Sequence, residues 1–281
     1  MNNLIVRAIT GALFVAVILG SIFWNETASF AVLSGFMILG IIEFYKLFNN
    51  NENIDIDWRI GLGMSVLIFG LLSVVNFGHL PSVILWSIVP IILVFMLIEL
   101  WREKKNPILN IAVLLFGMVY LITPFMMTIM LNHGDVQLSS NYIDYKQIPL
   151  IAGMFILVWT NDTFAYLSGR AFGKTKLFER ISPKKTWEGT VGGVILTIGV
   201  SYLLSMYTDA SDAVYWMVAG AIVSICAILG DLLESLFKRS LDVKDSGTIL
   251  PGHGGILDRF DAMLFAAPFF VAWTYLYIYF A

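Results

Sequence analysis

The chain has a single cysteine and few charged residues: only 13% of its 281 residues are Asp, Glu, Lys or Arg. The single cysteine, Cys226, excludes a disulfide or a thiolate metal site within one chain. A low charged fraction beside a hydrophobic fraction of 58% is typical of proteins that cross a membrane several times. The composition therefore predicts an all-α fold, a polytopic integral membrane bundle of helices.

Long apolar segments recur along the chain. A helix needs an apolar run of about 18 or more residues to span the hydrocarbon core of a bilayer. The first run could be mistaken for a signal peptide, because Arg7 precedes it, but eight further runs follow and no convincing cleavage site is present. We expect it to be retained. The nine predicted spans are residues 4–24, 27–48, 60–77, 81–100, 107–131, 148–168, 189–207, 213–237 and 260–280.

The distribution of basic residues predicts the orientation. If the N-terminus faces the cytoplasm, sixteen of the seventeen Lys and Arg residues lie on the inner side, and only Lys146 lies outside. Such asymmetry is what the positive-inside rule expects for an odd number of spans. We therefore predict a cytoplasmic N-terminus, a place in the cell (inner) membrane and an active site on the cytoplasmic side.

The two halves of the chain differ in polarity. Residues 1–145 contain five apolar spans with short connections and no recognisable motif, so we expect a helical scaffold. Glu43, at the inner end of the second span, fits a structural role there. Residues 146–281 contain four spans and two polar inner loops, 169–188 and 238–259. We expect this half to be the catalytic region of one integrated membrane unit.

Asp231 lies deep in the eighth predicted span, about two turns before its inner end. Glu234, Ser235 and Lys238 follow at helical offsets and share its face. For Glu234, an ion pair with Lys238 or a hydrogen bond between helices is as good an explanation as chemistry. A carboxylate as deep as Asp231 needs a cation or another partner to stay charged, which favours a functional role.

Asp258 and Asp261 follow the glycine-rich segment 252–255 and share one face at the start of the last span. Carboxylates at a helix N-terminus are favourable on dipole grounds alone, but that explains one of them better than both. Together with Asp231 on the preceding antiparallel span, they would supply the oxygen ligands that suit Mg²⁺ bridging to phosphates. His253 could contact a phosphate or cap the turn.

The other inner loop contains the segment 182–189, SPKKTWEG. Ser182 as N-cap, with Pro183 in the first helical position, is a good helix start. Lys184 and Lys185 could be ordinary anchors at the inner leaflet. Basic side chains over a helix start, opposite carboxylates from two other helices, also make a site for a polyphosphate held with metal.

Asn161, Asp162 and Thr163 interrupt the sixth span about two turns from its inner end. A polar cluster of this kind can simply hold helices together. Asp162, however, carries a charge at the depth of Asp231, which favours function.

These motifs resemble those of the phosphatidate cytidylyltransferases, the CDP-diacylglycerol synthases. Segment 235–261 matches the family pattern S-x-F-K-R, four residues, K-D-x-G, two residues, L-P-x-H-G-G-I-x-D-R-F-D, and segments 161–170 and 182–189 resemble its two other polar motifs. The first half resembles the family only in being helical and apolar. The fixed positions of the family pattern are occupied here by Ser235, Lys238, Arg239, Lys244, Asp245, Gly247, His253, Gly254, Gly255, Asp258, Arg259 and Asp261.

The resemblance implies a multi-span enzyme, a homodimer, that makes CDP-diacylglycerol and pyrophosphate from CTP and phosphatidic acid in phospholipid biosynthesis. It implies Mg²⁺ on Asp231 and Asp258, with a second, monovalent cation such as K⁺ beside it. The phosphate of phosphatidic acid attacks the α-phosphorus in line and needs no strong base, because it is already ionised at neutral pH. The partners expected are CTP, phosphatidic acid and membrane lipid, with no nucleic acid.

The predicted site draws on all three polar segments. As catalytic residues we predict Asp231, Asp258, Lys238, Arg239, Asp261 and Asp162. As substrate-binding residues we predict Ser182, Lys184, Lys185, Thr186, Glu188, Lys244, Asp245, His253, Gly254, Gly255 and Arg259.

Two alternatives remain open on the sequence. A CTP-dependent lipid kinase would transfer the γ-phosphoryl group to a polyprenol-type alcohol from a similar pocket. An ion-coupled transporter also places aspartates such as Asp162 and Asp231 within spans, although here the charges gather at one face. A CDP-alcohol phosphotransferase is disfavoured because its D-G-x-x-A-R motif is absent.

Overall fold

The structure is a computed structural model that describes residues 3–131, 148–207, 213–252 and 254–280. Within these ranges, nine helices are long and apolar enough to cross a membrane. The predicted helical membrane fold is therefore confirmed. Its elements are α1 (Asn3–Trp24), α2 (Glu26–Phe48), α3 (Trp58–Asn76), the 3₁₀ helix η1 (Ser82–Ser87), α4 (Ile88–Arg102), α5 (Pro107–Met130), α6 (Leu150–Phe172), β1 (Lys176–Phe178), β2 (Ser182–Thr186), α7 (Trp187–Ser205), α8 (Ala213–Ser240) and α9 (Leu257–Phe280).

The helices agree with the predicted spans to within a few residues, with two informative differences. The fourth span is composite, because η1 precedes α4 and the two together make the membrane-crossing length. Helix α6 runs to Phe172, past the predicted end at residue 168. Outside the helices, the described residues contain one antiparallel hairpin, β1–β2.

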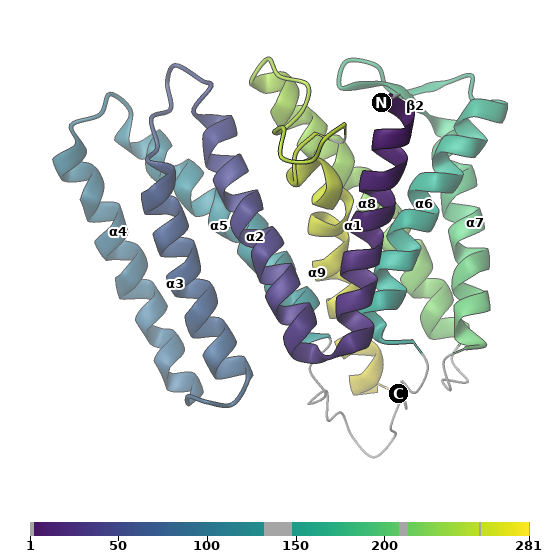
Figure 1. Ribbon diagram of the computed structural model, residues 1–281, viewed down its shortest axis with the longest axis horizontal. Helices are drawn as coiled ribbons and strands as arrows, with labels where there is room; N and C mark the ends of the chain where they lie inside the picture. The colour runs from purple at the N-terminus through teal and green to yellow at the C-terminus, as the bar shows by residue number, and fades with distance from the viewer. Residues whose placement is uncertain (1–2, 132–147, 208–212, 253, 281) are drawn as a thin grey trace.

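The polar connections gather at one end of the bundle. Figure 1 shows the N-terminus, the β1–β2 hairpin and the α8–α9 loop at the same end, with the C-terminus at the opposite end. An odd number of crossings places the two termini at opposite ends. Two crossings, α7 and α8, separate the two polar loops of the second half, so these loops lie at the same end. The site is therefore expected at this end.

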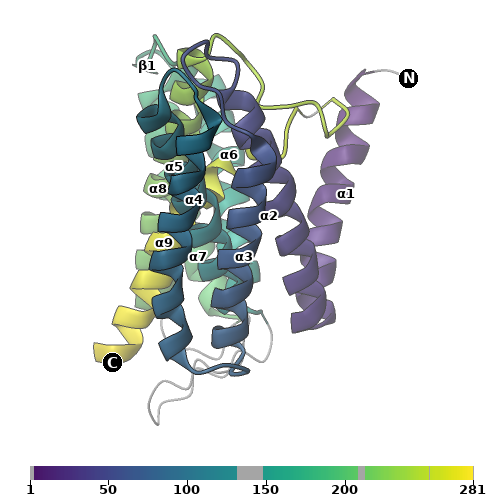
Figure 2. The ribbon, with the colours of Figure 1, turned by 90° about the vertical axis from the view of Figure 1, so that its left-hand side faces the viewer.

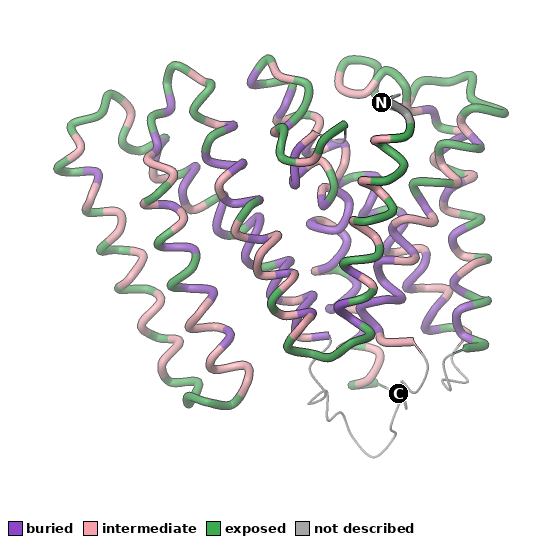
Figure 3. Tube along the Cα trace, in the orientation of Figure 1, coloured by how far each residue is buried: buried purple, intermediate pink, exposed green. Residues whose placement is uncertain are grey.

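The buried core runs through the middle of the bundle (Figure 3), along α2, α5, α6, α8 and α9. At its polar end the ring of Phe260, on α9, packs against three other phenylalanines, with ring centroids 5.1 to 5.4 Å apart. They are Phe14 of α1, Phe36 of α2 and Phe125 of α5. Large apolar burial of this kind fixes the first turn of α9, which carries Asp258 and Asp261.

Small residues let α6 and α7 approach closely. A Cβ on Gly189 would lie 2.7 Å from the carbonyl oxygen of Ala165, and a Cβ on Gly193 would lie 2.9 Å from the Ala165 Cβ. Neither position could carry a side chain without a shift of the helices, and such contacts are typical of helix packing in membranes. The close approach holds β2, which leads directly into α7, over the C-terminal end of α6.

Candidate active site

A cavity of about 580 Å³ lies at the polar end of the bundle, between α6, α7, α8 and α9. Ten of the predicted site residues line it, although they come from segments far apart in the sequence. The two polar loops therefore meet at a single site. These residues are Asp162 on α6, Lys184, Lys185 and Thr186 on β2, Asp231 and Lys238 on α8, Asp245 in the following loop, and Asp258, Arg259 and Asp261 on α9.

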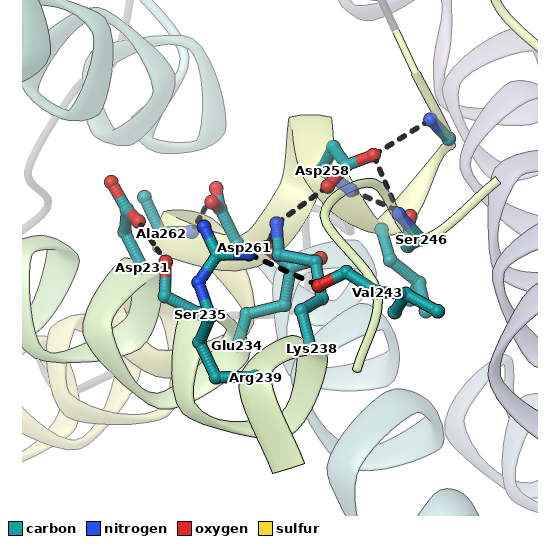
Figure 4. Close-up of polar contacts among 12 residues, drawn as sticks. Asp231, Glu234, Ser235, Lys238, Arg239, Val243, Ser246, Asp258, Asp261 and Ala262 are labelled. Carbon is teal, nitrogen blue, oxygen red and sulfur yellow. Dashed lines mark hydrogen bonds and ion pairs between the residues drawn. The ribbon is translucent and has the colours of Figure 1, made fainter. Parts of the chain in front are cut away.

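Lys238 is the centre of a buried ion-pair network (Figure 4). Its ammonium group donates to Glu234 Oε2 at 3.0 Å and to Asp258 Oδ1 at 2.6 Å. The three side chains are 11%, 2% and 6% exposed, respectively. The structural explanation offered for Glu234 is thus observed, and Lys238 ties α8 to α9 through Asp258. A cation and two carboxylates this well buried must be mutually compensating.

Asp258 is also held by the backbone of the preceding loop. Its Oδ2 atom accepts hydrogen bonds from the backbone N–H groups of Ser246, at 3.0 Å, and Gly255, at 2.8 Å. The Ser246 hydroxyl in turn accepts from the backbone N–H of Asp258, at 3.3 Å. The loop between α8 and α9 therefore fixes the orientation of this carboxylate before any substrate binds.

Asp231 faces the hairpin rather than this network. Its Oδ2 lies 2.6 Å from the ammonium group of Lys185, and its Oδ1 accepts from the Ser235 hydroxyl at 3.2 Å. The Asp231 carboxylate also acts electrostatically on Asp162 and Asp261 across the cavity. Lys185 of β2 and Asp231 of α8 thus form an ion pair within the cavity.

The predicted helix start at Ser182 is wrong. Residues Ser182–Thr186 form β2, and helix α7 begins at Trp187 with Thr186 as its N-cap. The Thr186 side chain accepts the backbone N–H of Gly189 at 3.2 Å. The Ser-Pro pair is compatible with a strand edge, and pairing with β1 decides the outcome.

Comparison with known proteins supports the resemblance of the motifs. The model of the family described as "Cytidylyltransferase family" matches residues 5–278. The chain belongs to the cytidylyltransferase family. Proteins named phosphatidate cytidylyltransferase are similar to it: that of Haemophilus influenzae is 40% identical over 185 residues, which are 63% of this chain and 59% of that protein. That of Rickettsia bellii is 36% identical over 202 residues, which are 68% of this chain and 82% of that protein.

A protein of the same name from Staphylococcus saprophyticus is 50% identical over 115 residues, which are 41% of this chain and 44% of that protein. The chain thus spans about half the length of the Haemophilus and Staphylococcus relatives. The two alternatives to a cytidylyltransferase, the lipid kinase and the transporter, receive no support from these comparisons.

The donor set of the cavity fits the Mg²⁺ ion that the resemblance implies. Asp231 and Asp258 line the same cavity and offer only oxygen ligands, which Mg²⁺ prefers. Among the described residues, no group of three or more His, Cys, Asp or Glu side chains is arranged to hold a metal ion. Mg²⁺ commonly takes one or two carboxylates and completes its shell with water and substrate phosphate oxygens, a pattern that this pair satisfies.

Several of the predicted site residues lie outside this cavity. Glu188 accepts the backbone N–H groups of Lys174 and Thr175, each at 3.1 Å, and so holds the turn between α6 and the hairpin. Arg239 is exposed and donates to the carbonyl of Val243 at 3.1 Å. Ser182 begins β2 and does not line the cavity, and Gly255 is buried beside Asp258. Lys244 and Gly254 line a neighbouring cavity. His253 lies outside the described residues.

The structural role expected for Glu43 is observed, but the sequence did not indicate that this residue holds a loop of the site. This residue of α2 is 5% exposed, and its Oε2 accepts the backbone N–H of Leu257 at 3.0 Å and the Ser246 hydroxyl at 3.5 Å. A Cβ on Gly247 or Gly255 would lie within 2.5 Å of its carboxylate oxygens. Glu43 therefore anchors the loop that orients Asp258. A carboxylate in an apolar span was the available signal.

Proposed function

We propose that this protein transfers the cytidylyl group of CTP to phosphatidic acid, giving CDP-diacylglycerol and pyrophosphate. The observation that carries the proposal is one cavity with an acidic wall from α6, α8 and α9 facing a basic wall from β2. Such a cavity at the end of membrane-spanning helices suits a reaction between a water-soluble nucleotide and a lipid phosphate. The names of the relatives support the same activity.

In this proposal the basic residues bind the triphosphate. Lys184 and Lys185 line the cavity, where a phosphate oxygen would compete with Asp231 for the Lys185 ammonium group. An oxygen of the phosphatidate phosphate forms a bond to the α-phosphorus, and the bond from that phosphorus to the β-phosphate oxygen breaks in line. Positive groups stabilise the charge that gathers on pyrophosphate as it leaves. Lys238 acts by orienting Asp258, because its ammonium group is already shared between two carboxylates.

We propose that Asp231 and Asp258 hold Mg²⁺, which supplies charge neutralisation at the reacting phosphates when bound. Asp162 and Asp261 add negative charge to the same cavity and would favour a second, monovalent cation such as K⁺. The acidic residues would then serve to bind cations. Without cations, the carboxylates would repel the negatively charged substrates.

We also propose a place in the cell inner membrane, with the N-terminus and the cavity on the cytoplasmic side. The distribution of Lys and Arg supports this orientation, because the basic loops gather at the end of the bundle that holds the cavity. The homodimer implied by the resemblance remains a proposal. Helix α4 has the least buried membrane-crossing segment and offers an apolar face to lipid or to a second copy.

The deciding experiment uses purified protein in detergent with phosphatidic acid, Mg²⁺ and CTP labelled in the cytosine ring. The ring label should move into the organic phase while pyrophosphate is released. A parallel reaction with CTP labelled on the γ-phosphate should leave the lipid unlabelled. Ring label that never enters lipid, with γ label that does, would replace the cytidylyltransferase by a lipid kinase.

A matched pair of variants connects the activity to the cavity. Asp231→Asn should abolish the transfer. Asp242→Asn removes the same charge from an exposed residue just beyond α8. Asp242 has a left-handed backbone, with a φ of 54°, and asparagine tolerates this conformation. This control should retain full activity. Equal activities for the two variants would remove Asp231 from the site.

A further inference from the structure

Helix α1 lies at one edge of the bundle in Figure 2 and meets the α8–α9 loop at its N-terminal end. There the Thr10 hydroxyl lies 3.3 Å from the carbonyl oxygen of Pro251 and 2.9 Å from that of Val6, the two acceptors for its hydrogen. Gly252 has a φ of 74°, and a Cβ at this position would lie 3.0 Å from the Cγ atom of Arg7. The loop thus lies directly against the Arg7 side chain, and the absence of a side chain at Gly252 avoids a clash with it.

A second cavity, of about 380 Å³, lies at this junction. Arg7 of α1, Lys244 of the loop and Arg259 of α9 line it, and Asp245 is the one acidic side chain in its described lining. All three basic residues are exposed, and within the described part of the chain none of them forms an ion pair. Three cations against one carboxylate leave an excess of positive charge, which suits a phosphomonoester dianion.

A third cavity, of about 190 Å³, runs between α1 and α6. Its lining combines apolar groups, among them Gly11, Phe14 and Trp159, with three carboxylates and one arginine, which are Asp162, Asp258, Asp261 and Arg259. Arg259 lines all three cavities. A partly apolar crevice beside α1 therefore adjoins both the basic cluster and the acidic residues of the catalytic cavity.

We propose that phosphatidic acid binds on the α1 side of the site, a proposal that rests on the function proposed above. Its phosphate lies among Arg7, Lys244 and Arg259, and its glycerol and proximal acyl groups lie in the crevice between α1 and α6. The excess of positive charge in the second cavity matches the phosphate, and the apolar groups of the crevice match the glycerol and acyl end. Helix α1 presents Ile5, Ile9 and Leu13 as exposed apolar side chains, as expected of a helix at the lipid boundary.

Arg7→Gln tests the phosphate contact. Loss of one charge-assisted contact should raise the KM for phosphatidic acid about tenfold and leave the KM for CTP unchanged. Arg59→Gln is the matched control, because Arg59 is an exposed arginine at the start of α3 that lines none of these cavities. A raised KM for CTP in Arg7→Gln would assign the residue to the triphosphate and overturn the proposal, as would unchanged constants.

Gly11→Leu tests the crevice, because a bulky side chain there would obstruct it. The KM for phosphatidic acid should rise severalfold, whereas Gly20→Leu, on the same helix with open space around its Cα, should behave as the unaltered protein does. Equal constants for the two variants would contradict a lipid in the crevice.

A binding measurement separates this proposal from the proposed activity. Phosphatidic acid brominated near the glycerol end should quench tryptophan fluorescence, and Trp159→Phe should remove part of that quenching. Brominated phosphatidylcholine, which lacks a phosphomonoester, should quench less at equal concentration. If the unaltered protein transfers no label into lipid, the activity fails while the quenching still decides the subsite. Quenching that Trp159→Phe leaves unchanged would rule the subsite out.

Discussion

Lys238 offers the sharpest test of how the site is held together. Its ammonium group lies 3.0 Å from Glu234 and 2.6 Å from Asp258, and all three side chains are buried. Replacing Lys238 by methionine keeps the apolar stem and removes the charge. Two buried carboxylates would then face each other without the cation between them.

The geometry sets the size of the effect. Removing one partner of a buried ion pair costs about 3–5 kcal/mol, because the remaining charge is left uncompensated. We therefore expect Lys238→Met to lower the free energy of unfolding by about 3–5 kcal/mol, a large part of the roughly 5–15 kcal/mol typical of a folded domain. Solvent screening should reduce this destabilisation only slightly, since the side chain of Lys238 is 11% exposed and that of Glu234 only 2%.

A second change should restore part of the stability. Glu234→Gln in the Lys238→Met background removes one of the two unpaired carboxylates, while Asp258 keeps its two backbone donors. The double variant should therefore be more stable than Lys238→Met by about 1–3 kcal/mol. Unfolding in detergent by titration with sodium dodecyl sulfate, followed by tryptophan fluorescence, measures both differences.

Arg239→Met is the matched control, because it removes a neighbouring positive charge from the same helix. Arg239 is exposed and makes one hydrogen bond to a backbone carbonyl. Its loss should change the free energy of unfolding by less than about 1 kcal/mol. Equal destabilisation by Arg239→Met and Lys238→Met, or a double variant less stable than Lys238→Met alone, would refute the assignment of Lys238 as the buried counter-charge.

Three further changes test other parts of the structure. Asp231→Asn should lower kcat at least about 100-fold with an unchanged unfolding midpoint, and chelation of Mg²⁺ should have the same effect on activity; a fully active variant would contradict its role. Glu43→Gln should lower kcat about tenfold with little change in the KM for CTP, since it loosens the loop that orients the metal carboxylate; a change in stability alone would make Glu43 merely structural. Gly153→Ala should destabilise by about 1–3 kcal/mol, because its Cβ would lie 2.4 Å from the Trp216 ring, whereas Gly35→Ala, with open space, should not; equal thermal midpoints would refute this packing.

The membrane spans could be predicted from the sequence because their signal is local. Every span is a contiguous segment of mostly apolar residues, and a helix satisfies its own backbone groups in lipid. The predicted spans are wrong mainly at their ends, where the helix continues beyond the apolar residues. Helix α6 continues through Arg170 to Phe172 because its last turn borders the polar cavity and not lipid.

The start of α7 shows where local signals fail. Ser182 and Pro183 have the propensities of a helix start, yet they lie in β2. Thr186 caps the helix instead, and the position of the cap follows from the pairing of β2 with β1. A short hairpin depends on a partner strand, so its own residues do not specify it.

The charged motifs were visible in the sequence, but their pairings were not. Residues spaced along α8 predict that Glu234 and Lys238 can meet, because both lie on one helix face. The contacts of Lys185 with Asp231 and of Glu43 with Leu257 join residues 46 and 214 positions apart. Such contacts depend on which helices pack together, and no local pattern carries that information.

By itself, the sequence determined the membrane-spanning helices, the gathering of charge in the second half and the family motifs, because each of these depends on residues that are close together in the sequence. Tertiary structure alone decided that Lys238 and Asp258 form a buried pair, that Glu43 anchors the loop beside them and that α1 borders a basic cavity. The reason is physical. A charge near the hydrocarbon core is stable only with a partner, and the partner is chosen by the packing of distant helices.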